Sequence, residues 1–135
     1  MYAIKAEITN PKARIFELPR QRTMYGGRNV EVGDTVYVFA SENEGGAGLV
    51  AKGIVLSAAA VPKRPGIERQ TPLVSVSIRR TALAKRALGR KELKPHDRWN
   101  DGQPETELNF KFYRQATNKI VGVSAETAAF LDAYF

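Results

Sequence analysis

The 135-residue sequence contains no cysteine and only one histidine, His96. The lack of cysteine excludes disulfides, thiolate nucleophiles, and the zinc and iron–sulfur sites that use cysteine ligands. A single histidine also excludes most metal sites and catalytic triads. These absences predict a protein without a metal or other cofactor, and they fit a reducing compartment such as the cytoplasm.

Long hydrophobic runs are absent as well. The longest apolar stretches, around Val36–Ala40 and Val55–Val61, are far shorter than the ~20 residues that span a bilayer. Lys5 and Glu7 interrupt the N-terminal segment before the apolar region of a signal peptide could form. Because no repeat or linker divides the chain, we expect one soluble, cytoplasmic domain over residues 1–135, with no membrane partner.

Positive charge is concentrated in one third of the chain. The protein carries a formal charge of +7, and the segment Val61–Trp99 alone has eleven basic and three acidic residues, a net +8, which leaves −1 for the rest. Such asymmetry indicates an anionic partner such as nucleic acid, although a basic surface kept for solubility would look the same. Membrane adsorption is less favoured, because Thr81–Leu88 offers mainly Ala and Leu opposite its charges.

Strand patterns dominate the sequence. Apolar residues alternate with others over residues 2–8, which predicts a half-buried strand. The polar loop Ser41–Gly48 separates two β-rich runs and predicts a hairpin with a long connection. Further strands are expected from five runs, which are Val36–Ala40, Leu49–Leu56, Val74–Ile78 with an extension to about Ala84, Leu108–Tyr113 and Ile120–Val123.

Helices are expected to be few and short. Asn10 before Pro11 predicts a turn or two of helix over Pro11–Glu17, a second short helix is expected near Arg90–Lys94, and Ser124 is the expected N-cap of a last helix. Five or six strands with two or three short helices exclude a βαβ fold, because each parallel crossover needs a full helix. The prediction is an α+β fold: a small, mostly antiparallel, partly closed barrel.

No convincing catalytic set is present. His96 adjoins Asp97, but neighbours on an extended chain point to opposite faces. Glu105 and Glu107 have no obvious partner, and the glycine-rich stretch Gly45–Gly48 lacks the Lys-Ser/Thr that follows a phosphate-binding loop. We therefore expect a binding protein that is not an enzyme.

The segment Tyr25–Asn29 is the best candidate for binding. It combines an aromatic ring, two glycines that let a ligand approach the main chain, a guanidinium, and an amide that can pair with a base edge. A tight turn that needs glycine would explain the same residues. The candidate nucleic-acid-binding residues also include possible stacking rings and nearby cations, and the full set is Tyr25, Gly26, Gly27, Arg28, Asn29, Arg79, Arg80, Lys85, Arg86, Trp99, Tyr113 and Arg114.

Five segments resemble the EVE domains of the PUA-like superfamily. The similar segments are Tyr2–Glu7, Gly26–Asn29, Val32–Val36, Gly53–Val55 and Ile120–Ser124. The Val-Gly-Asp turn within the third segment recurs across PUA-like proteins, so it supports the superfamily more than the family. The sequence departs from the family in having only Val30 and Glu31 between the Arg-Asn pair and that turn, and in having a single tryptophan.

This resemblance implies a PUA-like pseudo-barrel that binds DNA or RNA through a pocket for one flipped or modified base, next to Gly26–Asn29. Two alternatives remain. An ASCH-like hydrolase or nuclease would use Lys, Arg and a carboxylate such as Glu107 or Asp101. A protein-interaction or regulatory module, for example of a toxin–antitoxin or restriction system, would bind another protein.

Overall fold

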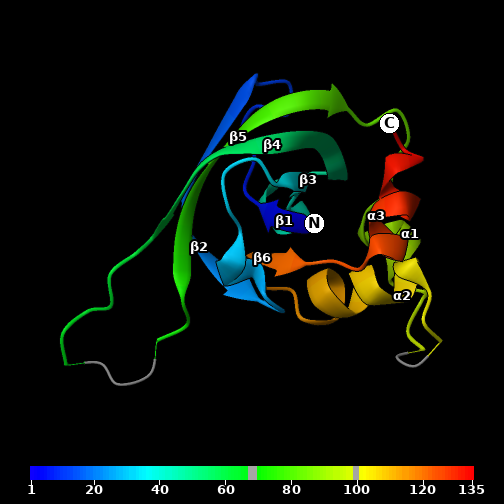
Figure 1. The fold of residues 1–135 in the computed structure, drawn as a ribbon. Coiled ribbons are helices and arrows are strands. Elements are labelled where there is room, and N and C mark those ends of the chain that lie inside the picture. The colour runs from blue at the N-terminus through cyan, green and yellow to red at the C-terminus, as the bar shows by residue number, and fades with distance from the viewer. Residues whose placement is uncertain (67–69, 99–100) are drawn as a thin grey trace.

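Six strands form a closed barrel in the computed structural model, which describes residues 1–66, 70–98 and 101–135 (Figure 1). The order around the barrel is β1-β3-β4-β5-β2-β6. The strands are β1 (Tyr2–Ala6), β2 (Ile15–Met24), β3 (Thr35–Ala40), β4 (Gly48–Ala60), β5 (Leu73–Leu83) and β6 (Lys119–Gly122).

Most neighbouring strands are antiparallel. The exceptions are β1 with β3 and β2 with β6, which pair in parallel. Strand β6 has only four residues, yet it lies between β1 and β2 and closes the barrel. The predicted α+β fold with a small, mostly antiparallel barrel is therefore confirmed, and the closure of the barrel is complete.

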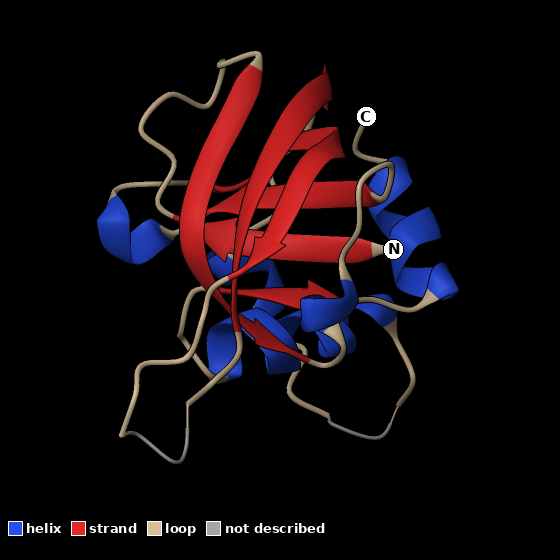
Figure 2. Ribbon diagram, turned by 60° about the vertical axis from the view of Figure 1, so that its left-hand side comes forward, coloured by secondary structure: helices blue, strands red, loops and turns tan. Residues whose placement is uncertain are grey.

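Short helices lie outside the strands (Figure 2). They are α1 (Arg90–Leu93), α2 (Pro104–Asn109), α3 (Ala125–Asp132), the 3-10 turns η1 (Gly27–Asn29) and η2 (Glu42–Glu44), and the π-helical turn η3 (Phe110–Arg114). Ser124 caps α3 as predicted, because its Oγ accepts a hydrogen bond from Thr127 N at 3.1 Å. None of the helices in the described ranges is long and apolar enough to cross a membrane.

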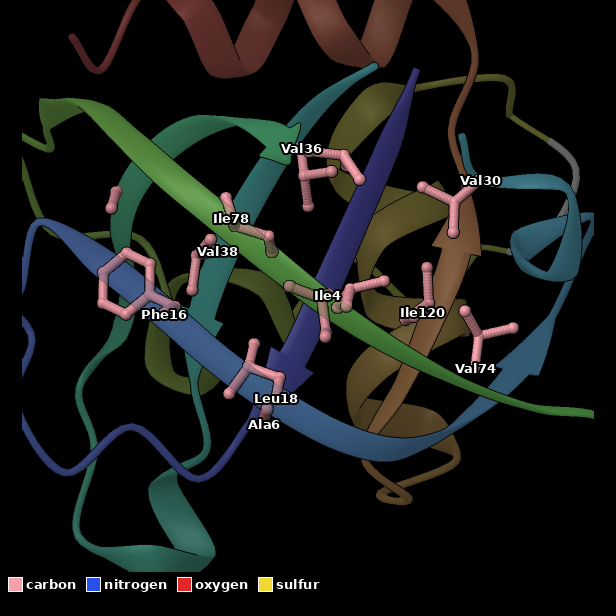
Figure 3. Packing of buried hydrophobic residues seen from close by; sticks show 13 residues of the cluster. Ile4, Ala6, Phe16, Leu18, Val30, Val36, Val38, Val74, Ile78 and Ile120 are labelled. Atoms are coloured by element: carbon pink, nitrogen blue, oxygen red, sulfur yellow. The ribbon is translucent and has the colours of Figure 1, made fainter. Parts of the chain in front are cut away.

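The hydrophobic core has two parts. Inside the barrel, side chains from all six strands meet around Ile4, Val38 and Ile78 (Figure 3). A second cluster fills the space between the barrel and the helices and includes Phe39, Phe112 and Leu131. Helices α1, α2 and α3 thus lie together on one outer side of the barrel (Figure 1).

The predicted helix over Pro11–Glu17 is wrong. Asn10 makes only a turn, in which its Oδ1 accepts from Lys12 N and its carbonyl accepts from Ala13 N. The chain then enters β2 at Ile15, because Phe16 and Leu18 alternate into the barrel core and outweigh the local capping signal.

The predicted strand over Leu108–Tyr113 is also wrong. Pro104 starts helix α2, and η3 continues it. Phe112 packs on Phe39 with ring centroids 5.1 Å apart, and the Tyr113 hydroxyl donates to Glu42 Oε1 at 3.2 Å. Both side chains are buried, so Tyr113 does not face outward as strand alternation predicted.

Strand β1 is buried on both faces, and the expected half-buried pattern is wrong. Lys5 has no exposed surface, and its Nζ donates to the carbonyls of Phe112 at 2.5 Å and Ala116 at 3.2 Å. An alternating lysine normally marks the solvent face of a strand. Here the segment after α2 covers that face and supplies carbonyl acceptors.

Candidate nucleic-acid interface

The double-glycine bend lies directly against strand β6. A Cβ at Gly27 would be 2.1 Å from the carbonyl oxygen of Ile120, so no other residue fits there without moving the main chain. Gly26 has φ 82°, a left-handed conformation that favours glycine. Main-chain contact with β6 therefore fixes the position of the following residues, Arg28 and Asn29, whose side chains are exposed.

Tyr25 precedes this bend and is held from two sides. Its carbonyl accepts from Gly122 N at 3.0 Å. Its ring lies 5.9 Å from the ring of Phe110, and the ammonium of Lys111 lies 5.1 Å from its centroid. Arg114 stacks on the other ring, with its Cζ 5.9 Å from the centroid of Phe110. Tyr25 thus presents a fixed, partly exposed ring beside η1.

The loop between β4 and β5 stands clear of the barrel in both views (Figures 1 and 2). Its base is tied to β2 by the Thr23 hydroxyl, which donates to Pro72 O at 2.8 Å. Gln70 links the two ends of the loop, because its side-chain amide accepts from Arg64 N at 3.1 Å and donates to Arg64 O at 2.9 Å. These bonds hold Arg64 on the side of the loop near β2.

Five cations gather where β2, η1 and this loop meet. We call Arg20, Arg22, Arg28, Lys63 and Arg64 the basic cluster; they line two adjoining cavities of 340 and 310 Å³. Within the described ranges none of the five has a carboxylate oxygen within 4.0 Å, whereas Lys52 and Lys111 both form ion pairs. Adjacent unpaired cations repel one another and create a positive field at this end of the barrel.

The larger cavity, which we call the Arg28 hollow, lies beside the double-glycine bend. Its lining consists of Arg20, Arg28, Asn29, Ala60, Val61, Pro62, Lys63, Gln70, Thr71, Pro72, Leu73 and Val74. The lining therefore combines polar groups with aliphatic groups. No aromatic ring contributes to the part of this lining that the structure describes.

A second, wider depression, the open groove, runs from the same arginines across the barrel end. It has a volume of 630 Å³ and is bordered by Pro19–Arg22 on one side and by Ala116–Asn118 on the other. Glu7, Glu17 and Glu44 also line it. Two of these carboxylates already accept hydrogen bonds, Glu17 from Ser77 at 2.9 Å and Glu44 from Asn118 at 2.8 Å.

The predicted cations of β5 lie elsewhere. Arg79 and Arg80 are six and seven residues along β5 from Leu73, about 20 Å along the strand at ~3.3 Å per residue. Arg80 Nε donates to Ala13 O at 3.0 Å and so holds the turn before β2. The chain after β5 ends up beside the C-terminal segment, where Lys85 N donates to Tyr134 O at 2.7 Å.

Arg86 is also engaged at that distant site. Its guanidinium stacks 4.3 Å from the ring centroid of Tyr134 and donates to Ala133 O at 3.0 Å. The structure therefore brings Tyr25, Gly26, Gly27, Arg28 and Asn29 together, and places Arg114 beside Tyr25 through Phe110. It does not bring Arg79, Arg80, Lys85 or Arg86 to the same cavity, Tyr113 is buried, and Trp99 lies outside the described residues.

Glu107 and Asp101, the two carboxylates considered for a hydrolase, stabilise the N-terminal ends of helices. Glu107 accepts from Ser124 Oγ at 2.7 Å, Thr127 Oγ1 at 2.8 Å and Lys111 Nζ at 3.0 Å. Burial opposes its ionisation, but these donors prevail and keep the pKa of Glu107 below its usual value. Asp101 accepts from Gln103 N and Thr106 Oγ1, both at 3.0 Å, at the start of α2. The oxygens of Glu107 and Asp101 thus accept hydrogen bonds that hold the starts of α2 and α3.

Sequence reasoning missed Arg20 and Arg22. The interpretation of Pro11–Glu17 as helix left no strand on which to place them. Strict alternation from Phe16 and Leu18 would also have turned both arginines toward the core, and only the register shift between Leu18 and Gln21 leaves them exposed. Their positions relative to η1 depend on strand pairing: β2 pairs with β5 at Arg22 and Leu73, and with β6 at Thr23 and Ile120. The i, i+2 arginines of Pro19-Arg20-Gln21-Arg22 were the available signal.

No protein-family model and no curated protein sequence matches the chain. Solved structures do. The DUF55 domain of human thymocyte nuclear protein 1 is 16% identical, with a TM-score of 0.65 over 98% of this chain and 96% of that chain. Human THYN1 protein in complex with DNA containing 5-methylcytosine is 15% identical, with a TM-score of 0.66 over 98% and 95%. A Pseudomonas putida protein is 16% identical, with a TM-score of 0.62 over 98% and 97%.

These similarities span almost the whole of each chain, whereas the identities are low, so they establish the fold. The resemblance to EVE domains that five short segments indicated is confirmed at that level. The chain has the EVE-type, PUA-like fold that the DUF55 domain of THYN1 also adopts.

Proposed function

We propose that this protein is a nucleic-acid-binding module that receives one flipped or modified base in the Arg28 hollow. The observation that carries the proposal is the basic cluster, five cations without carboxylate partners in the described ranges. Arg20, Arg28 and Lys63 line the hollow beside Asn29, and the other two line the adjoining cavity. Lys and Arg side chains neutralise phosphates and release counterions, which supplies most of the affinity for nucleic acid. The basic cluster would bind the phosphate backbone of the nucleic acid, and the Arg28 hollow would receive the base.

The lining of the hollow suits a base. Asn29 makes no side-chain hydrogen bond within the described ranges, so its amide is free to donate and accept along a base edge. Val61, Pro62 and Leu73 offer apolar surface to a flat ring or to a methyl group. Burying one methyl group is worth about 0.8 kcal/mol, roughly a fourfold preference for a methylated base. Stacking would use proline and guanidinium surfaces in place of an aromatic cage.

DNA containing 5-methylcytosine is the first ligand to test, because the THYN1 protein, which shares this fold, is known in complex with such DNA. Labelled oligonucleotides with one central cytosine or 5-methylcytosine, single-stranded and double-stranded, would be titrated at about 50 and 200 mM salt. Engagement of all five cations gives a log–log salt slope of about −3.5 on a single strand. Undetectable binding at low salt, or affinity independent of salt, would contradict the proposal.

Two variants separate base contacts from backbone contacts. Asn29→Ala is expected to reduce discrimination between bases by about 1–3 kcal/mol, whereas Arg22→Ala is expected to weaken binding to all sequences alike. Arg14→Ala is the matched control, since Arg14 is exposed, precedes β2 and lines none of the three cavities of this surface. Equal losses for Arg14→Ala and Arg22→Ala would mean that only net charge matters.

A further inference from the structure

Arg20 has an unusual backbone for its residue type. Its φ is 54°, and among the non-glycine residues that the structure describes only Tyr25 shares a positive φ. The residue sits in a β-bulge, where the register of β2 against β5 shifts between Leu18 and Gln21. Its N–H donates to the Ser75 hydroxyl at 3.0 Å, which fixes the bulge. Left-handed backbone strains residues with a Cβ, and such strain collects at functional sites.

The bulge places Arg20 at a junction. Arg20 is shared by the Arg28 hollow, the 310 Å³ cavity and the open groove. The side chain is exposed, and within the described ranges it has no carboxylate within 4.0 Å. A ligand that fills the Arg28 hollow and continues into the open groove must therefore pass Arg20.

The lining of the open groove carries both signs of charge: Arg20 and Arg22 line it, and so do Glu7, Glu17 and Glu44. A phosphate backbone would be repelled by the glutamates and attracted by the arginines, so within this groove it would bind beside Arg20 and Arg22. The volume of the groove, 630 Å³ against 340 Å³ for the hollow, leaves room for a further nucleotide.

We propose that Arg20 binds the phosphate that joins the base-bearing nucleotide in the Arg28 hollow to its neighbour, and that this neighbour lies in the open groove. The inference rests on the proposed function and deepens it, because it identifies the ligand as a strand of at least two linked nucleotides. A free base or nucleoside lacks the group that Arg20 holds. The bulge, with its left-handed arginine, positions the guanidinium for this contact.

The test removes the phosphate charge and the arginine in turn. Single-stranded hexadeoxynucleotides with one 5-methylcytosine would carry a neutral methylphosphonate at one linkage, moved through each position. With the wild-type protein, the linkage on one side of the 5-methylcytosine is expected to matter most, with about a tenfold loss of affinity. With Arg20→Gly the same replacement is expected to cause no further loss, because the partner charge is already absent.

Substitution to glycine and to alanine separates binding from strain. Both Arg20→Gly and Arg20→Ala remove the guanidinium. Both are expected to weaken binding of the 5-methylcytosine oligonucleotide without a methylphosphonate by the same factor, about tenfold. Only glycine relieves the left-handed backbone, so the Tm of Arg20→Gly is expected to exceed that of Arg20→Ala by about 3 °C. Arg14→Ala removes the same charge outside the three cavities and is expected to retain the methylphosphonate effect.

The outcomes are distinguishable. Equal methylphosphonate losses in wild type and Arg20→Gly would overturn the assignment of Arg20 while leaving the module a nucleic-acid binder. Maximal loss at a linkage that is not adjacent to the 5-methylcytosine would also overturn it. Failure of the wild-type protein to bind any of the oligonucleotides would overturn the proposed function, and the role of Arg20 with it.

Discussion

Lys5 and Lys119 are cross-strand partners in the antiparallel pair of β1 and β6, and neither side chain has any exposed surface. Their ammonium groups bond to main-chain carbonyls of the segment that follows α2: Lys5 to Phe112 and Ala116, Lys119 to Gln115 at 2.9 Å and Thr117 at 3.1 Å. Two buried cations thus hold one wall of the open groove. Burial, and then the charge of Lys5, lowers the pKa of Lys119 to about 8, and burial lowers that of Lys5.

The lysine pair predicts that stability rises with pH above 8. Between pH 8 and 10 the unfolded chain keeps the proton on Lys119 and the folded chain loses it, so the free energy of unfolding should increase, by about 1–2 kcal/mol. Above pH 10 the trend should reverse, because burial raises the pKa of Tyr37 and Tyr113 and only the unfolded state ionises them. Urea denaturation at intervals of pH would measure both limbs.

Lys119→Met provides the comparison for that profile. The variant should fold at pH 7 and show a smaller rise between pH 8 and 10, whereas the exposed Lys12→Met should follow the wild type. A profile that is flat or falling over this interval in the wild type would show that the two lysines titrate normally.

Glycine at position 27 is predicted to be indispensable for the bend. Gly27→Ala would place a methyl group 2.1 Å from the Ile120 carbonyl, and we expect it to lower the free energy of unfolding by about 3 kcal/mol. Gly26→Ala meets its first neighbour at 4.0 Å and should cost only the left-handed backbone, about 1 kcal/mol. Urea denaturation of both variants tests the order; a larger loss for Gly26→Ala would refute this packing.

Glu107 is predicted to stabilise the helical side at neutral pH. Glu107→Gln should lower the free energy of unfolding by about 1–3 kcal/mol at pH 7, because the amide removes the negative charge opposite Lys111 and replaces one of the two oxygens that accept from Lys111 and Ser124. The depressed pKa means that the stabilisation is present above pH 4.5 and disappears as the pH falls through the folded-state value. The difference between wild type and variant should therefore shrink in acid, and a difference that does not depend on pH would argue against an ionised Glu107.

The two groups of cations make opposite predictions for binding. Arg22→Ala with Arg64→Ala should weaken oligonucleotide binding about 10- to 100-fold, since both border the 310 Å³ cavity. Arg79→Ala with Lys85→Ala removes the same charge from the far part of β5 and the chain beyond it and should change affinity less than about twofold. Fluorescence anisotropy at fixed salt compares them, and equal losses would place the interface along β5.

Period-two patterns identified most of this fold. Strands β1, β3, β4, β5 and β6, the long-looped hairpin of β3 and β4, and the cap of α3 follow from alternation and capping residues close in sequence. Strand β2 was not predicted, because Asn10-Pro11 favours a helix start locally. Phe16 and Leu18 are extended because both pack into the barrel core, which the local sequence does not show. Apolar residues alternate over residues 108–113 as in a strand. In the structure these residues are helical, and most of them are apolar because the helix is buried on several sides.

The candidate site was predictable where it is local. The bend at Tyr25–Asn29 could be singled out as a candidate for binding from residue types within five positions. The convergence of Arg20 and Arg22 with Lys63 and Arg64 depends on the pairing of β2 with β5, which joins residues about fifty positions apart. The cations of β5 were predicted from the net charge of a sequence segment. Net charge does not indicate on which side of the barrel each side chain lies.

The place of β6 has a consequence for biosynthesis. This short strand, near the C-terminal side of the sequence, is the sole link between β1 and β2 in the barrel order. Before Lys119 and the residues after it have been synthesised, β1 and β2 each have an unpaired edge. The Gly26–Gly27 bend, which packs against the main chain of Ile120, also lacks its contact. The barrel and the proposed interface are therefore completed in the same late event, so a chain that stalls before β6 would expose unpaired strand edges and lack the support of the Gly26–Gly27 bend.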